Sequence, residues 1–133
     1  MLRYLMEQKL VEAADSDREQ SAGANLARAL ANLRDVKTVG DVRGIGLLRG
    51  VEFVADKLSK RPFASKENFA GFVAAASAKR GVLVYPMQGC VDGKSGDHLL
   101  IAPPAVITEE QINWAVEQLQ DAILEVSSEV ATA

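Results

Sequence analysis

The sequence predicts an α+β fold, in which a small, mainly antiparallel sheet of three to four strands carries helices packed on one face. The first observation behind this prediction is the order of the periodic segments, which reads helix, helix, strand, strand, helix, strand, strand, helix. The second is the closing helix, where apolar residues recur at helical spacing from Ile112 to Val126. The third is length, because 133 residues suffice for one hydrophobic core.

The amino-terminal part is expected to be helical. Apolar residues recur there every four positions, at Leu2, Met6, Leu10 and Ala14. The sequence therefore opens within an amphipathic helix, with no capping residue before Leu2. Asp15 to Asp17 interrupt this helix, and Ser16 or Asp17 is expected to cap a second one. The second helix has its own apolar face, made of Ala22, Leu26, Ala29, Leu30 and Leu33.

The next segment, from Val36 to Val54, is expected to form two strands around a glycine stretch. Val36 to Val42 form a short extended piece, and Leu47 to Val54 form a strand. Apolar and charged residues do not alternate cleanly along this second strand. We therefore expect one of its faces to be covered and the other to be partly covered.

The glycine stretch VRGIGLLRG, from Val42 to Gly50, allows two interpretations. A phosphate cradle is disfavoured, because the spacing G-x-G-x-x-x-G matches neither phosphate motif and a strand follows where a helix N-terminus is needed. Arg43 or Arg49 would be suited to clamping a carboxylate. The favoured interpretation is that Gly44 and Gly46 serve the backbone, through positive φ or close approach of a neighbouring chain.

A basic loop from Lys57 to Pro62 separates this region from a third helix. Ser65 is expected to cap this helix, which ends at Lys79-Arg80-Gly81 with cations in its last turn and a glycine just beyond. Its inward residues are expected to be Phe69, Phe72, Val73 and Ala76.

The remaining segments predict an antiparallel hairpin and a long closing helix. Val82 to Tyr85 form a strand stopped by Pro86, and His98 to Ala102 form its partner beyond a polar loop. Thr108 and Gln111 form a capping box, with Ile107 placed as a hydrophobic staple onto Ile112. Residues 127–133 are expected to be a frayed tail.

Composition excludes several classes of protein. Hydrophobic residues make up 48% and charged residues 25%, as in ordinary globular chains, and the net charge of −3 without a basic stripe disfavours nucleic acid as a partner. The longest apolar run, Phe69 to Ala78, is too short for a membrane span, and no signal peptide is apparent. The single Cys90 forms no internal disulfide and no metal cluster with His98, which favours a cytoplasmic location.

Individual candidate residues do not complete a catalytic set. Asp97 stands next to His98 and would be suited to orienting it as an acid–base group, although a histidine bonded to backbone at a loop end is the favoured interpretation. Cys90 has no adjacent histidine in sequence, so a bystander role is favoured. Tyr85 is equally suited to pointing into a cleft or covering the sheet. We therefore predict no catalytic, cofactor-binding or metal-binding residue from the patterns alone.

Several motifs in combination resemble a known family. The segments VGDVRGIGLLRGVEFVADKLSKRPF and GVLVYPMQGCVDGKSGDHLLIAPPAVITEEQI, with the closing helix, are similar to the carboxyl-terminal small domain of class III aminotransferases. These are pyridoxal-phosphate enzymes of fold type I, and the resemblance covers about Leu2 to Val126. The corresponding domain boundaries are 1–126 for the small domain and 127–133 for the tail.

The resemblance implies a fragment rather than a whole catalyst. The lysine that binds the cofactor covalently, the aspartate at the pyridinium nitrogen and the phosphate cup belong to the family's large domain, and no lysine here has matching context. Leu100 stands where many members carry an arginine that grips the substrate carboxylate. At most Tyr85, Met87 and His98 would line the substrate side of the cleft.

Two functions follow as expectations. The first is a domain fragment of a transaminase, which transfers an amino group between an amino donor and a 2-oxo acid in the intact enzyme and binds no pyridoxal 5'-phosphate alone. The uncapped helix at Met1 favours this reading. The alternative is a stand-alone binding or oligomerisation module derived from a transaminase, for which self-association is expected because its former domain surfaces expose apolar residues.

Overall fold

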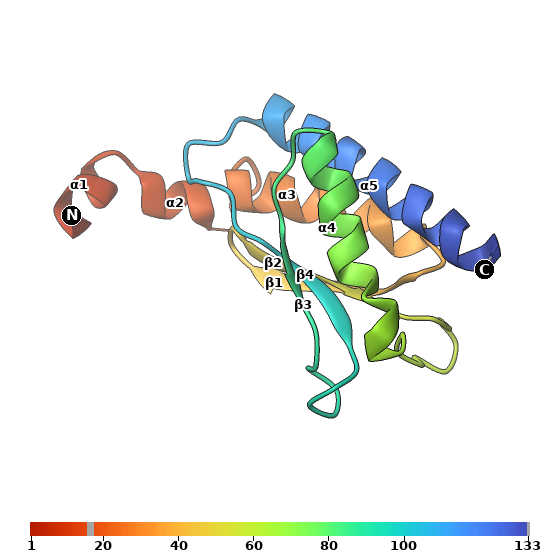
Figure 1. The fold of residues 1–133 in the computed structure, drawn as a ribbon. Helices are drawn as coiled ribbons and strands as arrows, with labels where there is room; N and C mark the ends of the chain where they lie inside the picture. Colours follow the sequence, from red (N-terminus) through yellow and green to blue (C-terminus); the bar gives the residue numbers. More distant parts are fainter. Residues whose placement is uncertain (16–17, 133) are drawn as a thin grey trace.

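The computed structural model describes residues 1–15 and 18–132. Its centre is a four-stranded antiparallel sheet in the order β1-β2-β4-β3 (Figure 1). The strands are β1 (Val39–Ile45), β2 (Leu48–Phe53), β3 (Tyr85–Met87) and β4 (Asp97–Ile101). The predicted α+β fold with a mainly antiparallel sheet is confirmed.

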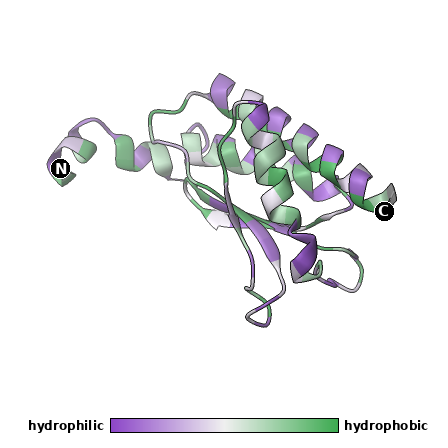
Figure 2. Cartoon of the chain, in the orientation of Figure 1, coloured by the Kyte–Doolittle hydropathy of each residue, from purple (hydrophilic) through white to green (hydrophobic). Residues whose placement is uncertain are grey.

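The helices α3, α4 and α5 lie over one face of this sheet (Figure 1). Their bounds are Ala22–Ala31 for α3, Phe69–Lys79 for α4 and Glu109–Thr132 for α5. Two short 3-10 turns accompany them, η1 (Asn32–Asp35) after α3 and η2 (Ser65–Glu67) before α4. Hydrophobic and hydrophilic bands alternate along α5 in Figure 2, as expected for a helix with one face on a core.

The hydrophobic core fills the space between these helices and the sheet. Phe69 of α4 is fully buried, with its ring 5.0 Å from that of Phe53 on β2 and 4.3 Å from that of Phe63. On the same face of the sheet, α3 and α5 contribute fully buried residues such as Leu30 and Ile123. The core therefore packs residues from early and late parts of the sequence against each other. Burial of this apolar surface is the main term that stabilises the folded domain.

Two short helices project from this body as an arm (Figure 1). They are α1 (Leu2–Glu7) and α2 (Leu10–Ala14), and neither contains a buried residue. The continuous helix expected here is wrong in one respect, because the chain turns at Gln8 and Lys9, where Lys9 adopts φ 55°. The apolar residues of the arm, coloured green in Figure 2, lie away from the core, so no packing holds one straight helix together.

Helix starts also differ from expectation. The proposed caps at Ser16 and Asp17 lie outside the described residues, while Ser21 caps α3 by accepting the Ala24 N–H at 3.1 Å. Ser65 begins the η2 turn instead of α4. Phe72 was expected to point inward but is 56% exposed, because it lies on the outer side of α4.

The hairpin and the final helix are confirmed with changes of bounds. The first hairpin strand was expected at Val82 to Tyr85 but is Tyr85–Met87, so residues 82–84 lie outside it. Pro86 lies inside β3 instead of stopping a strand before it, which is possible because β3 is an edge strand and its missing N–H breaks no ladder bond. The Thr108–Gln111 capping box is present, with bonds of 3.0 and 3.2 Å. Helix α5 continues through Ser127 to Thr132, beyond the end expected at Val126. Among the described residues, no helix combines the length and apolar character needed to cross a membrane.

Candidate functional site

The face of the sheet opposite the helices is the candidate site, and we call it the open face. Residues directly opposite each other on neighbouring strands share a face, so the strand register identifies its members. They are Asp41, Arg43, Ile45, Leu48, Glu52, Tyr85, Met87, His98 and Leu100. Ile45 is 77% exposed and Tyr85 is 66% exposed, whereas Val51 and Leu99 on the other face are fully buried. Among the described residues, helices therefore cover one side of the sheet and leave the other open.

The three residues expected to line the substrate side lie together on this open face. Met87 on β3 is opposite His98 on β4, and Tyr85 is opposite Leu100. His98 is half-buried and is also opposite Glu52 of β2. The structure brings these residues to one surface, and their role toward a substrate stays a prediction.

A hollow of about 550 Å³ lies on the same surface. Apolar and charged residues line it together, among them Leu48, Glu52, Val91, His98 and Leu100. Cys90 also lies at its wall as an exposed free thiol. Tyr85 and Met87 are not part of the lining, so of the three predicted residues only His98 reaches into this hollow.

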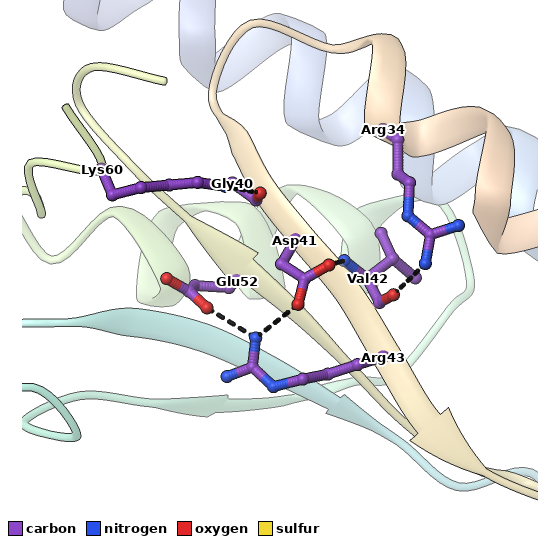
Figure 3. Close-up of polar contacts among 7 residues, drawn as sticks. All are labelled: Arg34, Gly40, Asp41, Val42, Arg43, Glu52 and Lys60. Carbon is purple, nitrogen blue, oxygen red and sulfur yellow. Dashed lines mark hydrogen bonds and ion pairs between the residues drawn. The ribbon is translucent and has the colours of Figure 1, made fainter. Parts of the chain in front are cut away.

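Arg43 is held by two carboxylates at the edge of the open face (Figure 3). Its Nη1 lies 2.9 Å from Asp41 Oδ2 and 2.6 Å from Glu52 Oε2. Donation from Arg43 holds the pKa of Asp41 below its usual value, and bonds to Glu52 and then Asp41 raise the pKa of Arg43. The guanidinium is therefore already paired within the chain and is not presented to a substrate carboxylate.

Arg49 lies on the other side of β2 and bonds to backbone. Its Nε donates to Gly46 O at 2.9 Å, and its two Nη atoms donate to Gly44 O at 3.0 Å and Gly23 O at 3.4 Å. The side chain is buried, and this burial lowers the pKa of Arg49. Arg49 therefore organises the backbone of the glycine stretch.

The backbone interpretation of the glycine stretch is confirmed. Gly44 and Gly46 have φ of 149° and 55°, in the region that favours glycine. A Cβ on Gly46 would lie 2.6 Å from Ala14 O, and a Cβ on Gly23 of α3 would lie 2.3 Å from the same oxygen. The arm therefore joins the body by backbone contact, and the glycines permit this close approach.

Asp97 does not orient His98, so the less favoured interpretation of this pair, an acid–base couple, is wrong. Successive residues of a strand point to opposite faces, and Asp97 is fully buried beneath α4. Its Oδ2 accepts the Ala70 N–H at 2.8 Å, and Gln88 Nε2 donates to the same carboxylate at 3.2 Å. Asp97 therefore caps α4 from across the fold, while Asn68, the neighbour in sequence, makes no capping bond. A pattern of neighbouring residues in the sequence does not reveal a helix cap that comes from a distant strand.

The described residues do not fit pyridoxal phosphate as a complete site. A lysine that binds an aldehyde needs a desolvated or otherwise activated amine. Here Lys57 donates to Arg34 O and Val36 O, and Lys60 donates to Gly40 O. The other lysines are exposed, namely Lys9, Lys37, Lys66, Lys79 and Lys94. Within residues 1–15 and 18–132, no three His, Cys, Asp or Glu side chains gather to hold a metal ion.

Comparison with known proteins identifies consistent relatives. The family model described as "Aminotransferase class-III" matches residues 1–123. The uncharacterized aminotransferase YodT of Bacillus subtilis is 30% identical over 92% of this chain. The adenosylmethionine-8-amino-7-oxononanoate aminotransferase of Nitratidesulfovibrio vulgaris is 34% identical over 77% of the chain.

Solved structures show the same fold. The crystal structure of a transaminase from the marine bacterium Virgibacillus matches 96% of the chain with a TM-score of 0.85 and 28% identity. The chain spans only 27% of that structure, and 27% and 17% of the two curated relatives. The matched proteins are therefore roughly four to six times as long as the region compared.

Proposed function

Because this chain belongs to the class-III aminotransferase family, we propose that it is the carboxyl-terminal small domain, residues 1–126, of a pyridoxal-phosphate-dependent transaminase. In the intact enzyme it helps transfer an amino group between an amino donor and a 2-oxo acid. The observation that carries the proposal is the family match over residues 1–123, in a chain that spans about a quarter of the Virgibacillus transaminase.

The open face is the surface through which the domain meets the cofactor-bearing part of the enzyme. Its exposed apolar residues support this role, since Ile45, Leu48 and Tyr85 would be covered by a second layer of protein. Tyr85, Met87 and His98 lie on this face and line the substrate side. The cofactor supplies the electron sink for the amino-group transfer, and this chain supplies side chains that form part of the wall around the substrate.

The chain alone does not transaminate. A reactive lysine has to be shielded and poised, whereas the lysines here are exposed or donate to backbone carbonyls. The glycine stretch also continues into β2 and not into a helix, so it offers no phosphate cradle. Cofactor binding therefore depends on the large domain.

Carboxylate recognition also has to come from outside β4. Leu100 is apolar, and Arg43, which lies across Gly50 from it on the same face, is paired with Asp41 and Glu52. A substrate that reaches this surface therefore meets apolar side chains, His98 and an arginine whose charge is already balanced by two carboxylates. This arrangement supports an amino donor bound in a different way from members that use an arginine on this strand.

A chimera tests these roles. The matching segment of the Bacillus subtilis relative is replaced by this chain, and cofactor binding and transamination are measured. We expect an active chimera in which Tyr85→Ala, Met87→Ala and His98→Ala each change KM or donor preference. Phe72→Ala serves as the control, because Phe72 is exposed on α4 away from the open face. Equal effects at Phe72 and at the three open-face residues would contradict the assignment.

The alternative function is a stand-alone module that associates through the open face. The same exposed apolar residues favour this reading. It predicts a stable oligomer of defined size for the 133-residue chain, measured by sedimentation velocity. A concentration-independent monomer would eliminate it.

A further inference from the structure

Strand β1 lies at one end of the sheet, so within the described part of the chain its outer edge faces no other strand. An edge strand presents backbone N–H and C=O groups that a second chain is able to pair with. In an antiparallel ladder, alternate residues point their polar groups outward. Ile45 and Leu48 close the β1–β2 hairpin, so the polar groups of Ile45, Arg43 and Asp41 face β2, and those of Gly44 and Val42 point outward. Gly40 lies at the register shift between Val39 and Asp41, and its carbonyl accepts from Lys60.

Four side chains occupy this edge. Lys60 Nζ donates to Gly40 O, and an Arg34 guanidinium nitrogen donates to Val42 O (Figure 3). The Val42 N–H donates to Asp41 Oδ1 at 2.8 Å. Farther along, Arg49 donates to Gly44 O at 3.0 Å. Each outward carbonyl from Gly40 to Gly44 therefore already has a partner.

The donors reach the edge from separate elements. Arg34 comes from η1, which precedes β1, and Lys60 comes from the loop after β2. Lys60 has φ 58°, a left-handed conformation that non-glycine residues seldom adopt. That loop is closed by an Asp56–Arg61 bridge and by Asp56 bonded to Ser59. The loop is thus shaped to direct Lys60 onto β1.

We propose that Arg34, Asp41 and Lys60 close the β1 edge against strand addition by a second copy of this chain. An incoming strand has to displace bonds to both cations and bring its own backbone beside them. The opposite edge is unsuited to pairing for another reason, since β3 is short and contains Pro86, which has no N–H. Association between copies is thereby restricted to other surfaces, the open face among them.

The double variant R34A/K60A tests this inference on the 133-residue chain. We expect it to self-associate at concentrations where the wild type does not change in sedimentation. Hydrogen exchange at the Gly44 amide should slow at least tenfold upon association, because this amide would become paired between strands, whereas the Val42 N–H already donates to Asp41 Oδ1. Circular dichroism checks that the variant is folded.

Two matched variants distinguish the loss of hydrogen bonds at the β1 edge from the loss of positive charge. K37A/K66A removes two positive charges from exposed side chains and should behave as the wild type. R34K/K60R keeps a donor at both positions and should also remain unassociated. The proposal is overturned if R34A/K60A sediments as the wild type does, if it associates without slower exchange on β1, or if K37A/K66A associates equally.

Discussion

Asp97 shows how one side chain ties distant parts of this domain together. It is fully buried, it caps α4 through the Ala70 N–H, and it holds Gln88 on the loop of the β3–β4 hairpin. A buried amide without its acceptor costs about 1–3 kcal/mol, which is more than an ordinary exposed cap contributes. The position of the hairpin relative to α4 therefore depends on this carboxylate.

Replacement of Asp97 should lower the free energy of unfolding. We expect Asp97→Ala to cost about 2–3 kcal/mol, because the Ala70 N–H is left unpaired and a small cavity remains. Asp97→Asn should cost less, since an amide oxygen still accepts that N–H. Urea unfolding monitored by circular dichroism measures both. Equal stability of wild type and Asp97→Ala would show that the cap is unimportant.

Asp41 should give the domain a small dependence on acid. Donation from Arg43 lowers the pKa of Asp41 below its ordinary value of 3.8 in the folded chain. Because the pKa of Asp41 is lower in the folded chain than in the unfolded chain, its ionised carboxylate stabilises the fold above pH 3.8. This stabilisation is lost as the pH falls through the pKa of the folded state. The pair is exposed, so its contribution is about 1 kcal/mol or less.

The variant Asp41→Asn removes this titration and keeps an oxygen for the Val42 N–H. We expect its unfolding free energy to fall below that of the wild type at about pH 6 and the two to converge as the pH falls below the lowered folded pKa of Asp41. Chemical unfolding across this pH range is the measurement. A constant difference at every pH would assign the effect to something other than the charge of Asp41.

At the scale of elements, the joint between the arm and the body explains the glycine stretch. The carbonyl of Ala14 at the end of α2 lies against Gly23 of α3 and Gly46 of the β1–β2 turn. Arg49 donates to both glycine carbonyls from the other side. The end of α2, the start of α3 and the β1–β2 turn therefore meet through backbone atoms, and this joint sets the direction in which the arm projects (Figure 1).

Gly46→Ala should loosen this joint. The new Cβ would meet Ala14 O at 2.6 Å and would also impose strain at φ 55°. Gly93→Ala is the matched control, because Gly93 has φ 81° and open space around its Cβ position. We expect Gly93→Ala to cost about 1 kcal/mol and Gly46→Ala at least about 1 kcal/mol more.

Limited proteolysis and amide hydrogen exchange measure how firmly this joint holds the arm. In Gly46→Ala, cleavage and exchange within α1 and α2 should be faster than in Gly93→Ala, while α5 should remain protected. Identical arm protection in both variants would mean that the close approach at Ala14 does not hold the arm.

At the scale of the whole molecule, periodic patterns were enough to predict the architecture. The repeat of Ile112 to Val126 and the capping box at Thr108 are local signals, so the final helix and its start were predictable. The break at Lys9, the exposure of Phe72 and the cap from Asp97 depend on tertiary packing, which one-dimensional periodicity does not contain. Pro86 was assigned as a stop because the edge position of β3 was not visible in the sequence.

The candidate site was predictable only in part, for a related physical reason. The residues Tyr85, Met87 and His98 were singled out by resemblance, and the register places them on one face. The pairing of Arg43 with Asp41 and Glu52 joins β1 to β2 and required the fold. The proposed role of Tyr85, Met87 and His98 toward a substrate rests on the resemblance, because this chain spans only 27% of the Virgibacillus transaminase.

The most direct measurement of the central claim is transamination by the purified 133-residue chain with pyridoxal phosphate, amino donors and 2-oxo acids. A class III transaminase serves as the positive control, and the unfolded chain with free cofactor gives the background. The account predicts a rate equal to that background, because the chain contributes a substrate-facing surface and no poised lysine. Turnover clearly above background by the folded chain would contradict the assignment as a small domain that acts only within a larger enzyme.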